Sequence, residues 1–384
     1  MFEIIVVFVL LSVLGVSGWY IARRLYKGFA CFFSGIKFWP VLTIVFFFIL
    51  LLLLGFMRSM LPFPEGIKDI FSRISGYSMG VLLYLLLFFL ITDLLLLVPR
   101  LLKLSFTTHH LFSGFVTVGV LLLTAITCVY GFVNARQIDK VYYEITLKGK
   151  QDISDMNVAV ISDLHLGAIG SEGRLIEIVD ELNRLEPEVV CIAGDFFDTD
   201  FTSIDNPEAA INTLRKLKAT YGVYVSLGNH DGGETYEQMI DFLKKANINV
   251  LRDQCSVIDE RLIIVGRLDA SPIGGYGNQK RKNLSEFFVR KDKTMPVIVL
   301  DHNPINIEEY SNEADVVLCG HTHKGQIFPA NIITDLIYTV DYGYYRKDEQ
   351  SPYVVVTSGV GYWGMPMRVG SDSEIVSLSF SSNK

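Results

Sequence analysis

The pattern of hydrophobic and polar positions changes near residue 150. Before that point the chain contains four long apolar runs, at Ile4–Ala22, Phe38–Met57, Met79–Val98 and Phe112–Val133. Each run has 19 to 22 residues with almost no charge. As a helix rising about 1.5 Å per residue, each is long enough to cross a hydrocarbon core about 30 Å thick. The pattern therefore predicts four transmembrane helices within residues 1–135, in preference to a buried helix bundle of a soluble protein.

After Met156 the apolar runs become short and are bounded by turn residues, which is typical of strands. The predicted strands are Val158–Ser162, Val189–Ala193, Val223–Leu227, Leu262–Gly266, Val297–Leu300, Val316–Cys319, Tyr353–Thr357 and Ile375–Phe380. Amphipathic stretches lie between several of them, at Arg174–Leu185, Glu208–Leu217 and Tyr236–Ala246. This alternation indicates an α/β domain over residues 153–384, with largely parallel pairing near its start and a linker at 136–152.

Charge separates the same two regions. Residues 1–150 carry 13 basic and 6 acidic side chains, whereas the remaining residues carry 21 basic and 35 acidic ones. The acidic second half argues against a nucleic-acid partner, because a phosphate backbone needs clustered cations. The five cysteines are odd in number and lack metal-type spacing, so they predict no disulfide framework.

Asp93 is the one acid inside a predicted span. An intramembrane carboxylate is a functional-site hypothesis by default. We favour the alternative that Asp93 lies near the span end and reaches interfacial water or Arg100.

Polar residues with metal-binding side chains follow the predicted strands directly. They are Asp163, His165, Asp195, Asn229, His302, His321 and His323, and all five histidines of the second half fall in these motifs. In an open α/β sheet, ligands bind at the carboxyl ends of strands. Imidazole, carboxylate and amide groups together suit Mn²⁺, Fe²⁺ or Zn²⁺ better than Ca²⁺. Seven ligands exceed the needs of one ion, so the sequence predicts a pair of divalent metal ions. If residues i and i+2 are extended, Asp163 and His165 both aim at this centre, as do His321 and His323.

These motifs resemble those of the calcineurin-like metallophosphoesterases. The matching segments are Asp163-Leu-His165, Gly194-Asp195, Gly228-Asn229-His230-Asp231, His302 and Gly320-His321-Thr-His323, in the order of the family. The resemblance covers roughly residues 153–384. A multi-span N-terminus followed by this domain is similar to the membrane-anchored bacterial branch of the family.

The resemblance implies a four-layer α/β/β/α fold and a phosphoesterase activity on phosphate ester or pyrophosphate bonds. It implies one metal held by Asp163, His165, Asp195 and His323, and a second held by Asp195, Asn229, His302 and His321. A metal-bridging hydroxide would attack phosphorus, His230 would be the general acid, and Asp231 would orient His230. The alternative is a non-catalytic membrane module that keeps the fold, although no ligand is missing. Lys324 departs from the branch, which has glycine there.

Two further expectations concern the membrane. Arg23 and Arg24, directly after the first run, favour a cytoplasmic first loop, which would place the second half of the chain outside the cell membrane. The bilayer would then be a partner, and we expect a phosphorylated substrate, with a membrane lipid or lipid-linked precursor as the candidate. Lys324 and Arg368 are the candidate head-group contacts. A rim facing lipid is predicted from the aromatic and apolar residues Tyr342, Tyr344, Tyr345, Tyr362, Trp363, Met365 and Met367. The alternative is that these residues pack the domain against its own spans.

Overall fold

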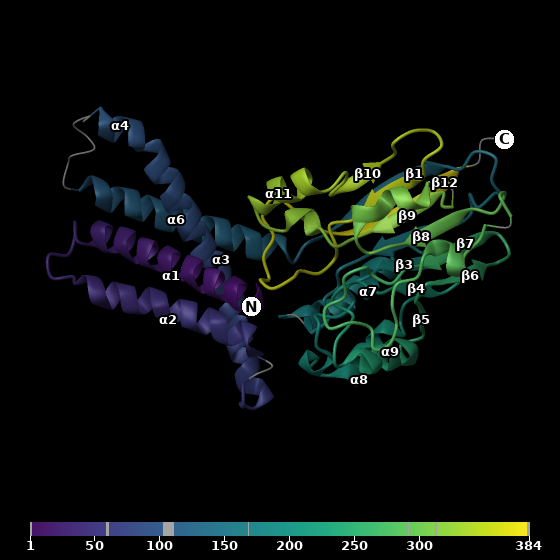
Figure 1. Cartoon of the computed structure of the whole chain (residues 1–384), viewed down its shortest axis with the longest axis horizontal. Helices are drawn as coiled ribbons and strands as arrows, with labels where there is room; N and C mark the ends of the chain where they lie inside the picture. Colours follow the sequence, from purple (N-terminus) through teal and green to yellow (C-terminus); the bar gives the residue numbers. More distant parts are fainter. Residues whose placement is uncertain are drawn as a thin grey trace. The chain divides into compact units, whose positions relative to one another are not determined.

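The computed structural model describes residues 2–58, 61–102, 111–167, 169–290, 292–311 and 313–381. The chain divides into two compact units, Met1–Phe132 and Val133–Lys384. Figure 1 gives the labels of the helices and strands.

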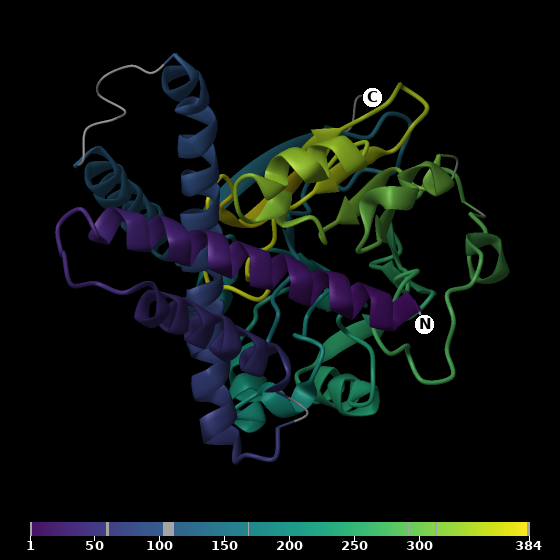
Figure 2. The same cartoon turned by 60° about the vertical axis from the view of Figure 1, so that its left-hand side comes forward.

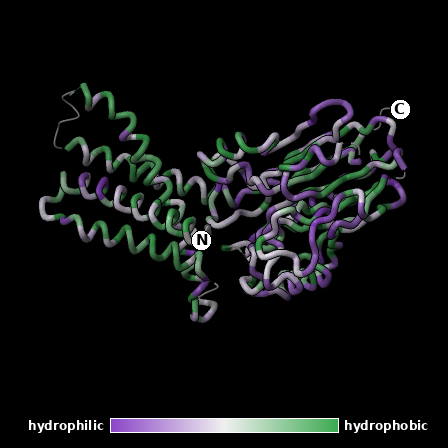
Figure 3. Tube along the Cα trace, viewed as in Figure 1, coloured by the Kyte–Doolittle hydropathy of each residue, from purple (hydrophilic) through white to green (hydrophobic). Residues whose placement is uncertain are grey.

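The first unit is helical. Its helices are α1 (Phe2–Phe29), α2 (Phe38–Phe56), α3 (Glu65–Leu95), α4 (Leu97–Leu101) and α6 (Phe112–Asn134), the last of which runs into the second unit. Four segments are long and apolar enough to cross a membrane, namely Val7–Phe29, Phe38–Phe56, Gly66–Leu95 and Phe112–Asn134. Figure 3 shows the hydrophobic colouring along these helices. The third is longer than predicted, because the polar stretch before Met79 continues the same helix.

An ion pair links two of these helices. Arg24 of α1 lies 3.4 Å from Asp93 of α3, and the Tyr20 hydroxyl donates to Asp93 at 2.6 Å. The Arg24 guanidinium also lies over the ring of Phe89. Arg24 and Tyr20 therefore hold the Asp93 carboxylate between helices. The predicted contact with Arg100 falls on a side chain outside the described residues. Arg24 is likewise part of a helix and not a loop cation.

The second unit contains two six-stranded sheets. The first has the order β1 (Ile138–Thr146), β12 (Ser373–Ser381), β2 (Val158–Ile161), β3 (Val189–Ala193), β4 (Val223–Ser226) and β5 (Ile248–Leu251). The second has the order β10 (Gly343–Tyr345), β11 (Tyr353–Val356), β9 (Val316–Cys319), β8 (Val297–Leu300), β7 (Leu262–Gly266) and β6 (Gln254–Ile258). Strands β2 to β5 are parallel to one another, and so are β7, β8, β9 and β11. This confirms the predicted parallel pairing.

Helices cover the outer faces of the two sheets. The helices α7 (Ser171–Asn183), α8 (Pro207–Leu214) and α9 (Tyr236–Lys245) share one apolar cluster with the first sheet, and Figures 1 and 2 show them along the same side of this unit. A second cluster lies between the sheets and joins residues such as Val160, Ile298 and Leu318. A third joins the second sheet to α10 (Leu284–Phe287) and the 3-10 helix η3 (Pro304–Tyr310). The order helix, sheet, sheet, helix confirms the predicted four-layer fold.

All eight predicted strands are present, with ends that differ by two residues or fewer. Four strands that are short or polar were not predicted, namely β1, β5, β6 and β10. The largest difference is β1, because it occupies most of the predicted linker at 136–152. Its residues Ile138–Thr146 pair with Ser373–Ser381 of β12 in parallel, so this segment belongs to the sheet.

Candidate metal centre

The predicted ligands come together at one end of both sheets. Asp163 and His165 follow β2, Asp195 follows β3, and Asn229 follows β4, while His302 follows β8 and the pair His321 and His323 follows β9. These strands are mutually parallel within each sheet, so their carboxyl ends meet at a common edge. The fold therefore assembles in space seven residues that are up to 160 positions apart along the chain.

One group of side chains consists of Asp163, His165 and His323. The Nε2 atoms of His165 and His323 are 3.2 Å apart, and His323 Nε2 lies 3.3 Å from Asp163 Oδ1. All three residues are buried. A nitrogen pair at this distance beside a carboxylate is the arrangement expected around a shared cation.

The second group consists of Asp195, Asn229, His302 and His321. His302 Nε2 lies 3.0 Å from Asp195 Oδ2 and 3.3 Å from His321 Nδ1. The same His321 nitrogen lies 2.9 Å from Asn229 Oδ1. Asp195 Oδ2 also lies 3.8 Å from His165 Nε2 of the first group. Asp195 thus stands between the two groups, as a bridging ligand must.

The side chains of this centre point lone pairs at one another, an arrangement that a bound cation would stabilise. His302 Nδ1 contacts the carbonyl oxygen of Ala193 at 2.8 Å, which requires this nitrogen to donate. In a neutral His302, Nε2 is then a bare lone pair that faces the oxygen of Asp195. Two lone pairs repel unless a proton or a metal ion lies between them. The donor set of imidazole, carboxylate and amide groups fits divalent transition metals.

The protonation of these residues follows the same logic. Burial lowers the pKa of His321 to about 4 and that of His323 to about 3, so both imidazoles are neutral near pH 7, as a ligand must be. His302 behaves differently, since burial lowers its pKa but Asp195 and Asp163 outweigh burial and raise it. The two carboxylates favour a proton on His302 Nε2, the nitrogen that faces Asp195. A metal ion bound to this nitrogen would take the place of that proton.

Five of the seven ligands have a left-handed backbone. The φ angles are 53° for Asp163, 47° for His165, 48° for Asp195, 71° for His321 and 50° for His323. Such angles are uncommon outside glycine and cluster at functional sites. The prediction that Asp163/His165 and His321/His323 meet the centre from an extended backbone is therefore wrong in its geometry, although both pairs do reach the centre.

Glycines next to the ligands allow this close packing. A Cβ atom on Gly194 would lie 2.6 Å from Nδ1 of His302, and one on Gly228 would lie 2.2 Å from Oδ1 of Asp195. Both contacts are shorter than a side chain tolerates. In the Gly-Asp and Gly-Asn-His-Asp motifs, the glycine beside one predicted ligand therefore leaves room for another, His302 next to Gly194 and Asp195 next to Gly228.

His230 lies beside the ligands. Its backbone N–H donates to Asp195 Oδ1 at 2.8 Å, and its ring centre is 5.0 Å from that of His165. Its Nδ1 is 2.5 Å from the hydroxyl of Thr199. Burial lowers the pKa of His230, although Asp195 opposes this effect. His230 lies within reach of His165 and Asp198, a group that could itself hold a cation, so its role as an acid that binds no metal stays a prediction.

The predicted role of Asp231 needs correction. Its two carboxylate oxygens accept the backbone N–H groups of Phe197 and Gly228, each at 2.8 Å. Adjacent residues point in different directions, so Asp231 braces the loops that follow β3 and β4 and does not hold the His230 ring, whose partner is Thr199. Two further residues near the centre, Thr199 and Asp198, were not predicted from the sequence. Asp198 Oδ1 lies 3.4 Å from Nδ1 of His165, the position of a carboxylate that orients a metal ligand.

The two candidate substrate contacts differ in the structure. The Lys324 ammonium lies 4.1 Å from the ring centre of Tyr342, and Lys324 has a φ of 50°, a left-handed conformation that glycine adopts more readily. Arg368 is fully buried, and its guanidinium donates to the carbonyl oxygens of Ser358, Gly359, Gly361 and Asp372 and to the Ser371 hydroxyl. Arg368 therefore holds the loop after β11 and is unavailable to a substrate.

The predicted aromatic rim is only partly present. Trp363 is 47% exposed and Tyr344 is 45% exposed. Tyr362, Met365 and Met367 are buried within the second unit. These three side chains are therefore not available to a lipid surface.

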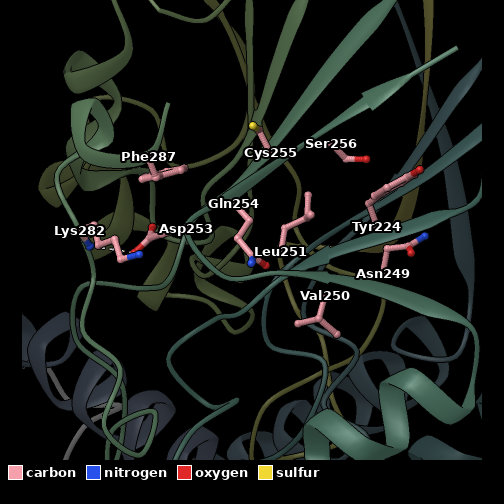
Figure 4. A pocket seen from close by; sticks show the side chains of 10 residues that line it. All are labelled: Tyr224, Asn249, Val250, Leu251, Asp253, Gln254, Cys255, Ser256, Lys282 and Phe287. Carbon is pink, nitrogen blue, oxygen red and sulfur yellow. Dashed lines mark hydrogen bonds between the residues drawn. The ribbon is translucent and has the colours of Figure 1, made fainter. Parts of the chain in front are cut away.

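A concave region elsewhere in the second unit lacks this chemistry. It has a volume of about 540 Å³ and lies along β4, β5 and β6, with Asp253, Cys255, Lys282 and Phe287 among its lining residues (Figure 4). The Lys282 backbone N–H donates to Asp253 there. None of its lining residues is one of the seven predicted ligands, so the metal centre remains the chemical site supported by the described residues.

Comparisons with known proteins identify the family of the chain. The family model of the calcineurin-like phosphoesterases matches residues 156–325. The chain is similar to a transmembrane protein with metallophosphoesterase domain of Danio rerio, with 31% identity over 80% of this chain and 73% of that protein. It is also 27% identical to a metallophosphoesterase of Campylobacter jejuni over 98% of both chains.

A metallophosphoesterase of Helicobacter pylori is 31% identical over 58% of this chain. The match covers 59% of the length of that relative. The aligned part of the Helicobacter protein is thus shorter than that of the Campylobacter protein.

Proposed function

The chain belongs to the calcineurin-like metallophosphoesterase family, and we propose from this premise that it is a membrane-anchored hydrolase of phosphate ester or pyrophosphate bonds with two divalent metal ions. The observation that carries the proposal is the convergence of Asp163, His165, Asp195, Asn229, His302, His321 and His323 around two adjoining positions. The first position would be formed by Asp163, His165, Asp195 and His323. The second would be formed by Asp195, Asn229, His302 and His321.

Bound ions of this kind polarise a phosphoryl oxygen and lower the pKa of a coordinated water. The chain itself would supply orientation and a proton. His302 is fixed by the Ala193 carbonyl, and His165 is oriented by Asp198. His230, held by Thr199 and by its own backbone bond to Asp195, would give a proton to the leaving oxygen.

We further propose that the substrate is a membrane lipid phosphate or a lipid-linked phosphate. The fourth candidate span ends at Asn134 and β1 begins at Ile138, so only three residues lie between them. At no more than about 3.6 Å per residue, this connection keeps the start of the catalytic unit within roughly 15 Å of the span end. Such a tether favours a substrate that is itself confined to the bilayer.

We propose the extracytoplasmic side for the second unit. Arg23 and Lys27 lie near the end of α1, and Lys37 precedes α2, so basic residues flank the loop between these helices. Loops rich in Lys and Arg are retained in the cytoplasm. An even number of spans then returns the chain to the side of its N-terminus.

The decisive experiment is hydrolysis by the metal-free protein reconstituted with Mn²⁺, Fe²⁺ or Zn²⁺. The panel contains soluble phosphomonoesters, phosphodiesters, and lipid phosphates in vesicles, with Asp195→Asn as the background control. We expect metal-dependent release of phosphate or of the phosphorylated product. Binding of phosphate compounds without any hydrolysis would instead favour the alternative, a non-catalytic module that keeps the fold.

A further inference from the structure

The short helix α11 (Ala330–Ile337) carries its apolar residues on the outside. Leu336 is 80% exposed, Ile337 61%, Ile333 56% and Ile332 51%. At about 100° per residue these four side chains share one arc of roughly 140° around the helix. The amphipathicity of α11 is therefore reversed relative to a helix that packs on a soluble domain.

The polar side of the same helix faces the domain. The hydroxyl of Thr334 donates to the Asp341 carboxylate, outside the helix, at 2.8 Å. The charged residue of the helix is Asp335, which lies beside the apolar arc and is exposed. The hydrogen bond to Asp341 thus ties the Thr334 side of α11 to the domain and leaves the apolar arc outward.

Two partly exposed aromatic residues lie on the segments next to the helix. Phe328, two residues before the helix, is 41% exposed, and Trp363 is 47% exposed. Trp363 is joined to the segment that precedes α11, because its N–H donates to Gln326 at 2.8 Å and its carbonyl accepts from the same side chain at 3.0 Å. We call Phe328, Ile332, Ile333, Leu336, Ile337 and Trp363 the α11 surface.

A chain of hydrogen bonds links the α11 surface to the end of the fourth span. Asn134, the last residue of α6, donates to the carbonyl of Ser371 and to the carboxylate of Asp372, both at 3.0 Å. The Ser371 hydroxyl lies 3.2 Å from the Gln326 carbonyl, and the Phe328 N–H donates to Val369 at 2.7 Å. All these residues belong to the second unit. These hydrogen bonds therefore connect the start of α11 to Asn134, the residue at which the fourth candidate span ends.

The α11 surface also adjoins the metal centre. Tyr338, which follows the helix, has its ring centre 6.2 Å from that of His321. Trp363 has its ring centre 6.2 Å from that of His230. A group bound to this surface therefore lies next to two residues of the centre.

We propose that the α11 surface inserts into the interfacial layer of the bilayer that holds α6, and that it presents the metal centre to phosphates at the membrane surface. Exposed Ile and Leu side chains on one face of a helix, with Phe and Trp beside it, are the composition that interfacial helices use. A tryptophan at the edge of such a surface suits the head-group region. The membrane contact stands on these residues alone, whereas its part in selecting a lipid substrate rests on the proposed function.

The test places an environment-sensitive fluorophore on α11 in the full-length protein. Leu336→Cys is compared with Asp335→Cys, its exposed neighbour outside the apolar arc, after Cys255→Ser and Cys31→Ser remove the accessible thiols. The protein is reconstituted in phosphatidylcholine vesicles with bromine atoms on the upper acyl chain. We expect the probe at 336 to be blue-shifted and at least about twofold more quenched by brominated lipid than the probe at 335.

Two results overturn the proposal. Equal emission in water-like surroundings at both positions would show that α11 faces solvent. A blue-shifted probe at 336 that brominated lipid does not quench would show that protein covers the arc, either the first unit or a second copy of the chain. Hydrolysis of a soluble aryl phosphate, measured in both variants, verifies that each remains folded.

A second comparison separates the membrane contact from the substrate. Leu336→Glu is assayed on phosphatidic acid in vesicles and on the soluble aryl phosphate, with Asp335→Glu as the matched control. We expect Leu336→Glu to lower the rate on the lipid at least about tenfold relative to the soluble ester. If the wild type does not cleave the lipid while the probe at 336 is still quenched, the membrane contact survives and the lipid substrate of the proposed function fails.

Discussion

At the scale of single residues, the centre depends on side chains that would repel one another without a cation. His302 shows this most clearly, because the Ala193 carbonyl fixes one nitrogen as a donor and turns the other toward Asp195. The left-handed backbone at five ligands adds a conformational cost. Metal binding would offset both costs, so we expect the affinity for metal to be coupled to the stability of the second unit.

Asp195 is the residue whose loss should affect both metals. Its Oδ2 lies 3.0 Å from His302 Nε2 and 3.8 Å from His165 Nε2, and its Oδ1 accepts the His230 N–H. Asp195→Asn keeps the shape but removes the charge. We expect metal affinity at both positions to fall by more than about 100-fold, the upper range for residues that only orient a ligand. Metal analysis of the purified variant tests this, with exposed Asp241→Asn as control. Two retained ions would contradict the bridging role.

His230 should affect the reaction and leave metal content unchanged. His230→Ala is expected to lower kcat by ~10²–10⁴ on a poor leaving group, because a general acid contributes about that factor. The loss should shrink for p-nitrophenyl phosphate, whose leaving group needs little protonation. Thr199→Val, which removes the ring's hydroxyl partner, should show a weaker version of the same pattern. An equal loss on both substrates would exclude His230 as the acid.

At the scale of secondary-structure elements, the turns after the strands decide where the ligands lie. Gly194 has a φ of 77°, and a Cβ there would lie 2.6 Å from the imidazole of His302. The turn between β3 and Asp195 therefore depends on the absence of a side chain.

Gly194→Ala should consequently weaken metal binding. A left-handed alanine costs about 1–2 kcal/mol, and the new methyl group must displace His302. We expect an affinity loss of ~10–100-fold, measured by metal titration. Gly173→Ala is the matched control, since its Cβ would meet nothing within 4 Å inside helix α7. There alanine should raise the stability by up to about 1 kcal/mol. The same metal affinity in both variants would show that the turn tolerates a side chain.

Strands can be predicted from the sequence when every position along them is buried. Strands β3, β8 and β9 are buried at every position, so they read as continuous apolar runs. Strands β5 and β6 mix exposed and buried positions and are short. In strand β1, charged residues interrupt the apolar pattern. The strand is recognisable only through its pairing with β12, which lies more than 200 residues later.

The same distinction separates the site residues. The seven ligand types and their places after strands were evident in the sequence, because metal chemistry restricts the choice of side chain. The direction of a side chain was not evident. Asp231 turns to backbone amides and Arg368 turns inward to carbonyl groups, since each satisfies buried polar groups that only the folded chain creates. Thr199 and Asp198 carry no signal until the loop after β3 is folded.

At the scale of the whole molecule, two units with opposite solvent requirements share one chain. The four candidate spans expose apolar side chains such as Phe8, Trp39 and Leu94, whereas the second unit buries its apolar residues between and outside two sheets. Among the described residues of the second unit, the α11 surface is a place where neighbouring apolar side chains reverse this rule. A function at a membrane surface accounts for both features.

The side of the membrane can be read from two natural cysteines. Cys31 follows α1 and is partly exposed, and Cys255 of β6 is exposed, whereas Cys128, Cys191 and Cys319 are buried. The proposed orientation places Cys31 in the cytoplasm and Cys255 outside. A membrane-impermeant maleimide applied to intact cells should therefore label wild type and Cys31→Ser alike and leave Cys255→Ser unlabelled. After the cells are permeabilised, Cys255→Ser should become labelled through Cys31. Labelling of Cys255 only after permeabilisation would place the second unit in the cytoplasm, because a charged reagent cannot cross the hydrocarbon core to reach it.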